Sequence, residues 1–85
     1  MKIMIVDDER IASEELYDIC LSHPDIKEAN VFNNPAEALY FISEHKDIDI
    51  AFLDIEMPVI KGIELAKRIK ALSKNTRIIS ITLAM

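Results

Sequence analysis

Short, uninterrupted apolar runs that end at polar residues alternate along this chain with longer segments of helical period. Such runs are typical of strands buried on both faces of a parallel sheet. Strands are expected at residues 3–6, 29–32, 50–53 and 77–82. Helices are expected over residues 10–22, over residues 35–45 and in a third segment that ends near residue 72. This alternation predicts an α/β fold, a doubly wound parallel sheet with right-handed crossovers.

Two of the predicted helices carry an apolar stripe that is expected to face the sheet. In segment 10–22 the stripe comprises Ile11, Ala12, Leu16, Ile19 and Cys20. In segment 35–45 it comprises Ala36, Leu39, Tyr40 and Ser43. The second helix is expected to begin at Pro35, because Asn34 suits the N-cap and proline suits the first helical position.

Length and charge restrict the classes of function that this chain can serve. Its 85 residues are enough for one small domain with one core. A net charge of −5 leaves no basic face for the phosphates of a nucleic acid, so direct nucleic-acid binding is not expected. The apolar runs fall far short of the roughly 20 residues that cross a bilayer. One cysteine and no signal segment predict a soluble protein of the reducing cytoplasm.

Polar residues follow three of the four predicted strands, and three of these residues are carboxylates. Asp7 and Asp8 follow the first strand, Asp54 follows the third, and Thr82 ends the fourth. In such folds ligands bind at the carboxyl ends of the strands, so these side chains are expected to converge. Three carboxylates favour a hard divalent cation such as Mg²⁺, and the lack of His or Cys among them argues against zinc. A carboxylate beside such an ion can attack phosphorus to give an aspartyl phosphate.

Each of these residues also has a plainer interpretation. Asp7 and Asp8 alone also fit a solvated acidic loop, Asp54 alone fits a helix N-cap, and Thr82 alone fits a β-branched residue in a strand. His23 and His45 are expected at the surface, because neither has a partner at ligand spacing.

Three segments together resemble the receiver domain of a two-component response regulator. They are Val6-Asp7-Asp8-Glu9, the run Leu53-Asp54-Ile55-Glu56-Met57-Pro58 with Gly62 four residues beyond the proline, and Ile81-Thr82. The resemblance spans the whole chain and implies a flavodoxin-like, or CheY-like, fold. The motifs Asp-Asp-Glu and Ile-Glu-Met-Pro are most similar to those of receivers that are attached to a LytTR-type DNA-binding domain.

The resemblance implies a role for each matching residue. Asp54 would accept a phosphoryl group from a sensor histidine kinase. Mg²⁺ would be held by Asp8, by Asp7 directly or through water, and by the backbone carbonyl of Glu56. Thr82 would be the switch hydroxyl that follows the phosphate. Such a domain catalyses its own phosphorylation and is not an enzyme that turns over a released substrate.

The chain departs from the family pattern in two places. Family members continue through a fifth strand, which bears a lysine near the phosphate, and through further helices, whereas this sequence stops at Met85. Residues 1–85 are therefore expected to form a single receiver domain that is truncated after the fourth strand, with that strand as an exposed edge and one sheet face partly uncovered. Leu83 stands where the family usually has a small residue.

Two other functions compete with a working phosphoacceptor. The first is a docking or decoy fragment without phosphoryl chemistry, or a domain-swapped homodimer that completes its sheet in trans. The second is a small phosphatase with an aspartyl nucleophile, similar to haloacid dehalogenase-like enzymes. That class places an Asp-x-Asp pair after its first strand, whereas this chain has the adjacent pair Asp7 and Asp8 there.

Overall fold

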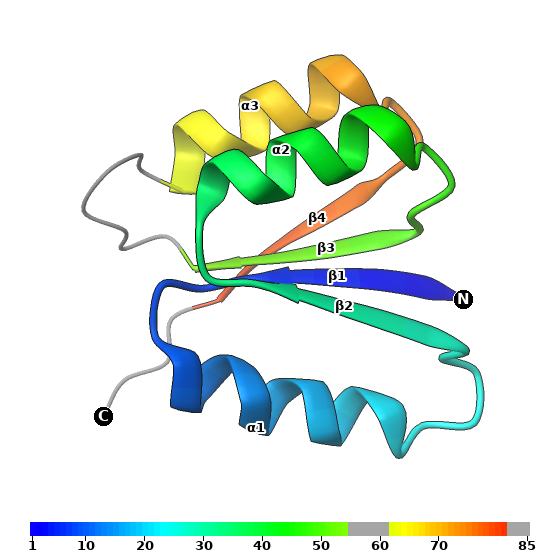
Figure 1. Ribbon diagram of the computed structural model, residues 1–85. Helices are drawn as coiled ribbons and strands as arrows, with labels where there is room; N and C mark the ends of the chain where they lie inside the picture. Colours follow the sequence, from blue (N-terminus) through cyan, green and yellow to red (C-terminus); the bar gives the residue numbers. More distant parts are fainter. Residues whose placement is uncertain (55–61, 82–85) are drawn as a thin grey trace.

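A parallel four-stranded sheet with strand order β2-β1-β3-β4 forms the centre of the molecule. The computed structural model describes residues 1–54 and 62–81. Helix α1 covers one face of the sheet, and helices α2 and α3 cover the other (Figure 1). The elements are β1 Lys2–Val6, α1 Arg10–Leu21, β2 Glu28–Phe32, α2 Pro35–Glu44, β3 Ile50–Asp54, α3 Gly62–Leu72 and β4 Arg77–Ile81. The predicted alternation is confirmed.

Strand β1 is the most buried strand because it has a neighbour on each side and helices above and below. Val6 is in register with Phe32 of β2 and with Leu53 of β3. The side chains of residues 3–6 are all fully buried. Since successive side chains of a strand point to opposite faces, a continuous apolar run supplies both cores. The position of β1 in the middle of the sheet, covered on both faces, explains why its sequence is apolar without interruption.

Each face of the sheet has its own core. Ile3 and Ile5 pack with Cys20 under α1, whereas Met4 and Val6 join the larger core under α2 and α3. The other fully or almost fully buried members of the larger core are Ala38, Ile42, Ile48, Ala51, Leu53, Leu65 and Ile69. These two cores fix the register of β1 against its neighbours, since a one-residue slip would exchange the two faces.

The predicted buried stripe of α1 is wrong at its two isoleucines. Ile11 is 70% exposed and Ile19 is 66% exposed, whereas Ala12, Ser13 and Cys20 are buried. Ala12, half-buried Leu16 and Cys20 follow one another at intervals of four residues and form one row along the helix. Ile11 and Ile19 each come one residue before a buried member of this row, Ala12 and Cys20, and so each lies about 100° round the axis from it, because a helix has 3.6 residues per turn. The apolar stripe of α1 is therefore wider than the surface that the sheet covers.

The predicted stripe of α2 is wrong at Ala36, Tyr40 and Ser43, whereas Leu39 packs against the larger core as predicted and the N-cap is confirmed. Ala38 and Ile42 are fully buried, while Tyr40 is 63% exposed and Ala36 and Ser43 also lie at the surface. Apolar residues surround this helix on nearly all sides, so period alone did not select the face that meets the sheet. The Oδ1 atom of Asn34 accepts a hydrogen bond from the Ala36 N–H at 2.7 Å, as expected of an N-cap.

Strands β2 and β4 are the edges of the sheet within residues 1–54 and 62–81. On β4, Ile79 pairs with Phe52 and is 42% exposed. Phe52 packs into the core beneath α1 and is only half-buried. This part of the structure agrees with the expectation of an exposed fourth strand and a partly uncovered sheet face.

Candidate metal centre

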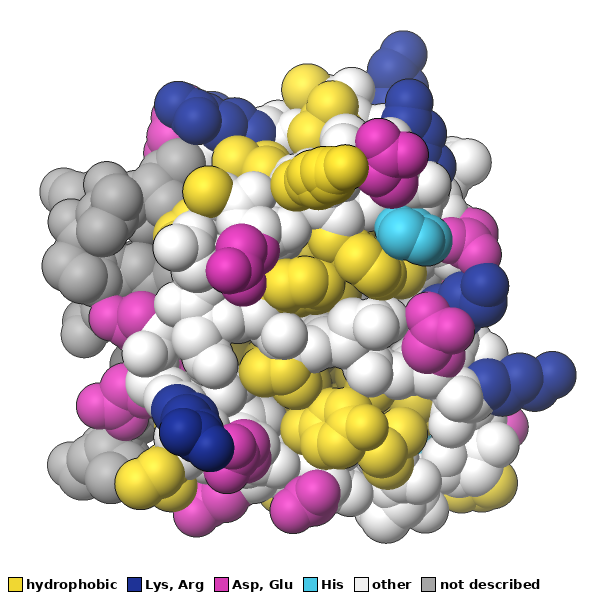
Figure 2. All heavy atoms as spheres, in the orientation of Figure 1, with side chains coloured by type: hydrophobic (Ala, Val, Ile, Leu, Met, Phe, Trp, Pro, Cys, Tyr) yellow, Lys and Arg dark blue, Asp and Glu magenta, His cyan; other side chains and the backbone are white. Residues whose placement is uncertain are grey.

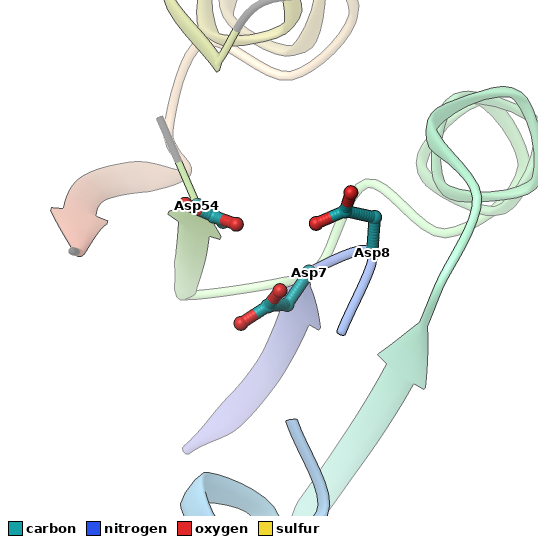
Figure 3. Close-up of side chains that lie close together, drawn as sticks. All are labelled: Asp7, Asp8 and Asp54. Atoms are coloured by element: carbon teal, nitrogen blue, oxygen red, sulfur yellow. The ribbon is translucent and has the colours of Figure 1, made fainter. Parts of the chain in front are cut away.

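Three aspartates converge where β1 and β3 end at one edge of the sheet (Figure 3). Asp7 and Asp8 directly follow β1, and Asp54 is the last residue of β3. One carboxylate oxygen of each residue lies within 4.8 Å of those of the other two. Figure 3 shows the side chains of Asp8 and Asp54 pointing toward each other from the two strands. The structure therefore brings together the three carboxylates that were predicted to converge.

The strand order explains why this edge forms a site. Helix α1 connects β1 to β2 on one face, and α2 then crosses on the other face to β3, which lies on the opposite side of β1. The helices that follow β1 and β3, α1 and α3, thus lie on opposite faces of the sheet, and the strand order changes direction between these two strand ends. Ligands of doubly wound sheets bind at such a switch point.

Three of the four polar atoms of Asp7, all but Oδ2, form hydrogen bonds with other residues. Its N–H donates to the Phe32 carbonyl at 3.1 Å, and its Oδ1 accepts from the Glu9 N–H at 2.8 Å. Its own carbonyl accepts from Nδ2 of Asn33 at 2.7 Å. The residue is 1% exposed, and its Oδ2 has no hydrogen-bond partner in the part of the chain that the structure describes. A buried oxygen in this state costs free energy unless a ligand or a proton reaches it.

Burial raises the pKa of Asp7 from 3.8 to about 6. The hydrogen bond from the Glu9 N–H opposes this shift, whereas Asp54 raises the pKa further by its charge and by the hydrogen bond that the two carboxyl groups can form once Asp7 takes up a proton. The charge of Asp8 acts in the same direction. Two ionised carboxylates have no hydrogen to share, so these groups need a proton or a cation between them. A divalent cation satisfies all three groups at once.

The donor atoms at this edge select the kind of cation. All three side chains offer carboxylate oxygens, which suit Mg²⁺ or Ca²⁺. Both histidines are exposed, on the α1–β2 connection and at the end of α2, and Cys20 is buried in α1. Mg²⁺ keeps several waters and needs few protein ligands, so a cluster of three carboxylates is compatible with it. The residues present therefore fit the ion that the family implies.

Two predicted site residues lie outside the described residues, and one contributor was not foreseen. Glu56 and Thr82 fall in segments 55–61 and 82–85, and so does Leu83. Asn33 was missed, although it directly follows β2, the strand next to β1. The rule that polar residues at strand ends converge applies to it as well, and this signal was available in the sequence.

The fold and the acidic edge define a doubly wound α/β domain with three carboxylates at its switch point. Residues 3–85 match the family model of the response regulator receiver domain. This chain belongs to that family, whose members act in two-component regulatory systems. The predicted resemblance and the flavodoxin-like architecture are thereby confirmed.

Curated relatives of similar sequence are longer regulators. The chain is 33% identical over 82 residues to the transcriptional regulatory protein YpdB of Escherichia coli strain K12, covering 96% of this chain and 33% of YpdB. It is also 33% identical over 82 residues to the sensory transduction protein LytT of Enterococcus faecalis, covering 96% of this chain and 34% of LytT. The chain thus spans about a third of the length of these relatives.

Solved receiver structures have the same architecture. The response regulator domain of Thermotoga maritima CheB matches with a TM-score of 0.85 and 34% identity, over 96% of this chain and 60% of that chain. The CheX-CheY-BeF3-Mg+2 complex from Borrelia burgdorferi matches with a TM-score of 0.81 and 32% identity, over 96% of this chain and 61% of that chain. Among residues 1–54 and 62–81, no helix has the length and apolar character needed to cross a bilayer.

Proposed function

We propose that this chain is a phosphoacceptor receiver, in which Asp54 takes a phosphoryl group from a sensor histidine kinase in a reaction that requires Mg²⁺. The observation that carries the proposal is the buried Oδ2 of Asp7, which has no partner among the described residues and belongs to a cluster of three carboxylates that includes Asp54. The name of the Borrelia burgdorferi complex, a related structure, includes Mg²⁺ and BeF₃. That likeness supports an ion at the same edge here.

Asp7 and Asp8 are the proposed side-chain ligands of the ion, together with the backbone carbonyl of Glu56. Oδ1 of Asp7 is engaged by the Glu9 N–H, so Oδ2 is the atom left for a ligand. When bound, Mg²⁺ supplies positive charge that offsets the negative charge on the phosphoryl oxygens. Asp54 ends β3 at the same edge as Asp7 and Asp8, and the proposal places the docked phosphohistidine at this edge.

The proposed transfer is an in-line displacement at phosphorus. An ionised oxygen of Asp54 forms the new P–O bond while the P–N bond to the kinase imidazole breaks. The electron pair of the broken bond stays on the imidazole nitrogen, which takes a proton from solvent. One phosphoryl group is transferred, and no substrate is turned over and released.

The consequences of phosphorylation are proposed to pass through Thr82 to an output domain. The hydroxyl of Thr82, which follows Ile81 in the sequence, would donate a hydrogen bond to the new phosphate and so shift the domain between two states. Relatives such as YpdB are named as transcriptional regulators and are about three times as long. A DNA-binding output domain is therefore the proposed receiver of the signal, and the cytoplasm is the proposed compartment.

The test is the mass of the chain after incubation with Mg²⁺ and acetyl phosphate. The wild-type chain should gain the mass of one phosphoryl group only when Mg²⁺ is present, and Asp54→Asn should gain none. Asp18→Asn is the matched control, because Asp18 lies exposed on α1 away from the three carboxylates. It should be modified like the wild type.

A folded wild-type chain that gains no mass would overturn the proposal. Circular dichroism of the same sample establishes that it is folded. The competing proposal of a docking or domain-swapped fragment would then be preferred, because the exposed Ile79 on edge strand β4 offers a surface for a second copy. Sedimentation equilibrium of the same sample tests for that dimer.

A further inference from the structure

Asn33 joins the strand next to β1 to the loop that carries two of the three carboxylates. Its Nδ2 donates to the Asp7 carbonyl at 2.7 Å and to Oγ of Ser13 at 3.0 Å. These partners are 26 and 20 residues away along the chain. One amide group therefore contacts both the end of β1 and the first turns of α1.

Ser13 makes this contact a rigid one. Its side chain is fully buried, and its Oγ donates to the Arg10 carbonyl at 2.8 Å while it accepts from Asn33. The Ser13 N–H also donates to the Glu9 carbonyl at 3.1 Å. Asn33 thus contacts the chain on both sides of Asp8 and Glu9, at Asp7 before them and at Ser13 after them.

We infer that Asn33 is a positioning residue for the cation centre, which it serves by fixing the backbone from which Asp7 and Asp8 project. This role rests on the proposed function. Without an ion, the three carboxylates repel one another, and a free loop would let them move apart. Groups that orient metal ligands from outside the coordination shell commonly change metal affinity about 10- to 100-fold when they are removed. Asparagine suits this place because it donates hydrogen bonds without adding a fourth negative charge.

The next residue offers a matched control. Asn34 has the same side chain, but its Oδ1 accepts from the Ala36 N–H and so caps α2 instead of contacting the carboxylate loop. Asn33→Ala and Asn34→Ala therefore remove the same atoms at adjacent positions. Each loses hydrogen bonds of the fold, and only the first loses contact with Asp7.

The experiment is a titration of the chain with Mg²⁺ alone, followed by the amide chemical shifts of Asp8 and Glu9 in ¹⁵N-labelled protein. Asn33→Ala should raise the dissociation constant about tenfold, and Asn34→Ala should leave it unchanged. Ser13→Ala should raise it in the same direction by a smaller factor, because the contact of Asn33 with Asp7 remains. Urea midpoints report how much each substitution weakens the fold as a whole.

A second measurement separates positioning from general loss of structure. In Asn33→Ala, the Mg²⁺ concentration for half-maximal phosphorylation by acetyl phosphate should rise about tenfold, while the rate at saturating Mg²⁺ stays near that of the wild type. Asn34→Ala should change neither value. A variant that is merely destabilised would lose rate at all Mg²⁺ concentrations.

Each outcome decides one proposal. Equal Mg²⁺ affinity in the wild type, Asn33→Ala and Ser13→Ala overturns the role of Asn33 and leaves the proposed function intact. An equal loss of affinity in Asn33→Ala and Asn34→Ala also overturns it, because the effect then follows stability. A folded wild-type chain that binds no Mg²⁺ overturns the cation centre, and the positioning role with it.

Discussion

Asp7 is a carboxylate in surroundings that differ greatly from water, and this difference affects the stability of the chain. The folded state buries its carboxyl group beside Asp54 and raises its pKa to about 6, compared with 3.8 for an ordinary aspartate. The folded chain therefore binds this proton more tightly than the unfolded chain does. By linkage, the contribution of Asp7 to stability falls as the pH rises from about 4 to about 6.

Without Mg²⁺, Asp7→Asn should stabilise the chain at pH 7.5. The substitution removes a charge whose burial costs about 3 kcal/mol, from a pKa difference of about two units at 1.36 kcal/mol each. The asparagine Oδ1 can still accept from the Glu9 N–H. Urea unfolding at several pH values should show a gain of about 2–3 kcal/mol at pH 7.5 that disappears near pH 4.

Asp18→Asn serves as the control for this pH dependence, because Asp18 is an exposed residue of α1. Its difference from the wild type should stay within about 0.5 kcal/mol throughout. A constant difference between Asp7→Asn and the wild type from pH 4 to pH 7.5 would contradict the assignment.

At the scale of elements, the connection between α3 and β4 is held by buried hydroxyl groups. Oγ1 of Thr76 donates to the Ile48 carbonyl at 2.7 Å and lies 2.7 Å from Oγ of Ser73. Oγ of Ser73 also donates to the Lys46 carbonyl at 3.3 Å. Both hydroxyl residues are at most 3% exposed. They join the start of β4 to the segment that leads into β3, at the end of the sheet opposite the carboxylates.

Thr76→Val should lower the free energy of unfolding by about 1–3 kcal/mol, because the substitution keeps the shape and leaves the buried Ile48 carbonyl without its donor. Urea unfolding with an unchanged m-value measures this loss. The comparison is Ser43→Ala, which removes an exposed hydroxyl that donates only to the Tyr40 carbonyl of its own helix. That change should stay within about 0.5 kcal/mol, and equal effects of the two substitutions would refute the role of burial.

At the scale of the whole molecule, the carboxylates of Asp7, Asp8 and Asp54 repel one another at one edge of the sheet, and a bound cation should reduce this repulsion. Figure 2 shows one face of the molecule, where acidic side chains lie among apolar patches. The chain as a whole carries a net charge of −5. Scattered charges of this kind are screened by salt, whereas two of the three convergent carboxylates, Asp7 and Asp54, are buried and are screened much less. Binding of Mg²⁺ should therefore stabilise the entire fold through this one edge.

Mg²⁺ at ten times its dissociation constant should add about 1.4 kcal/mol to the free energy of unfolding, by mass action. For a domain of this size the melting temperature should rise by roughly 5–10 °C. Differential scanning calorimetry with Mg²⁺, and again after chelation, measures the rise and its reversal. NaCl at the same ionic strength should have little effect, and Asp7→Asn should lose most of the rise. An equal rise with NaCl would show screening instead of binding.

The local sequence pattern predicted the elements almost to the residue, because each depends on neighbours in the chain. Continuous apolar runs gave the strands, and the pair Asn34 and Pro35 gave the start of α2. The carboxylates at strand ends were predictable for the same reason, since parallel strands place their carboxyl ends at one edge. The family motif then gave Asp54 its expected role.

Other features of the molecule could be learned only from the tertiary structure, because they depend on contacts between segments that are far apart in the chain. Period alone allowed Ile11 and Ile19 to face the sheet, but the place of α1 over β1 and β2 left them exposed. The sequence places Asn33 at a strand end beside Asp7, but only the structure shows the hydrogen bond between them, which spans 26 residues. The pKa of Asp7 likewise follows from burial and from Asp54 on another strand. The sequence by itself determined which residues end each strand, and the packing of the elements determined which of them meet, because burial and charge act through space.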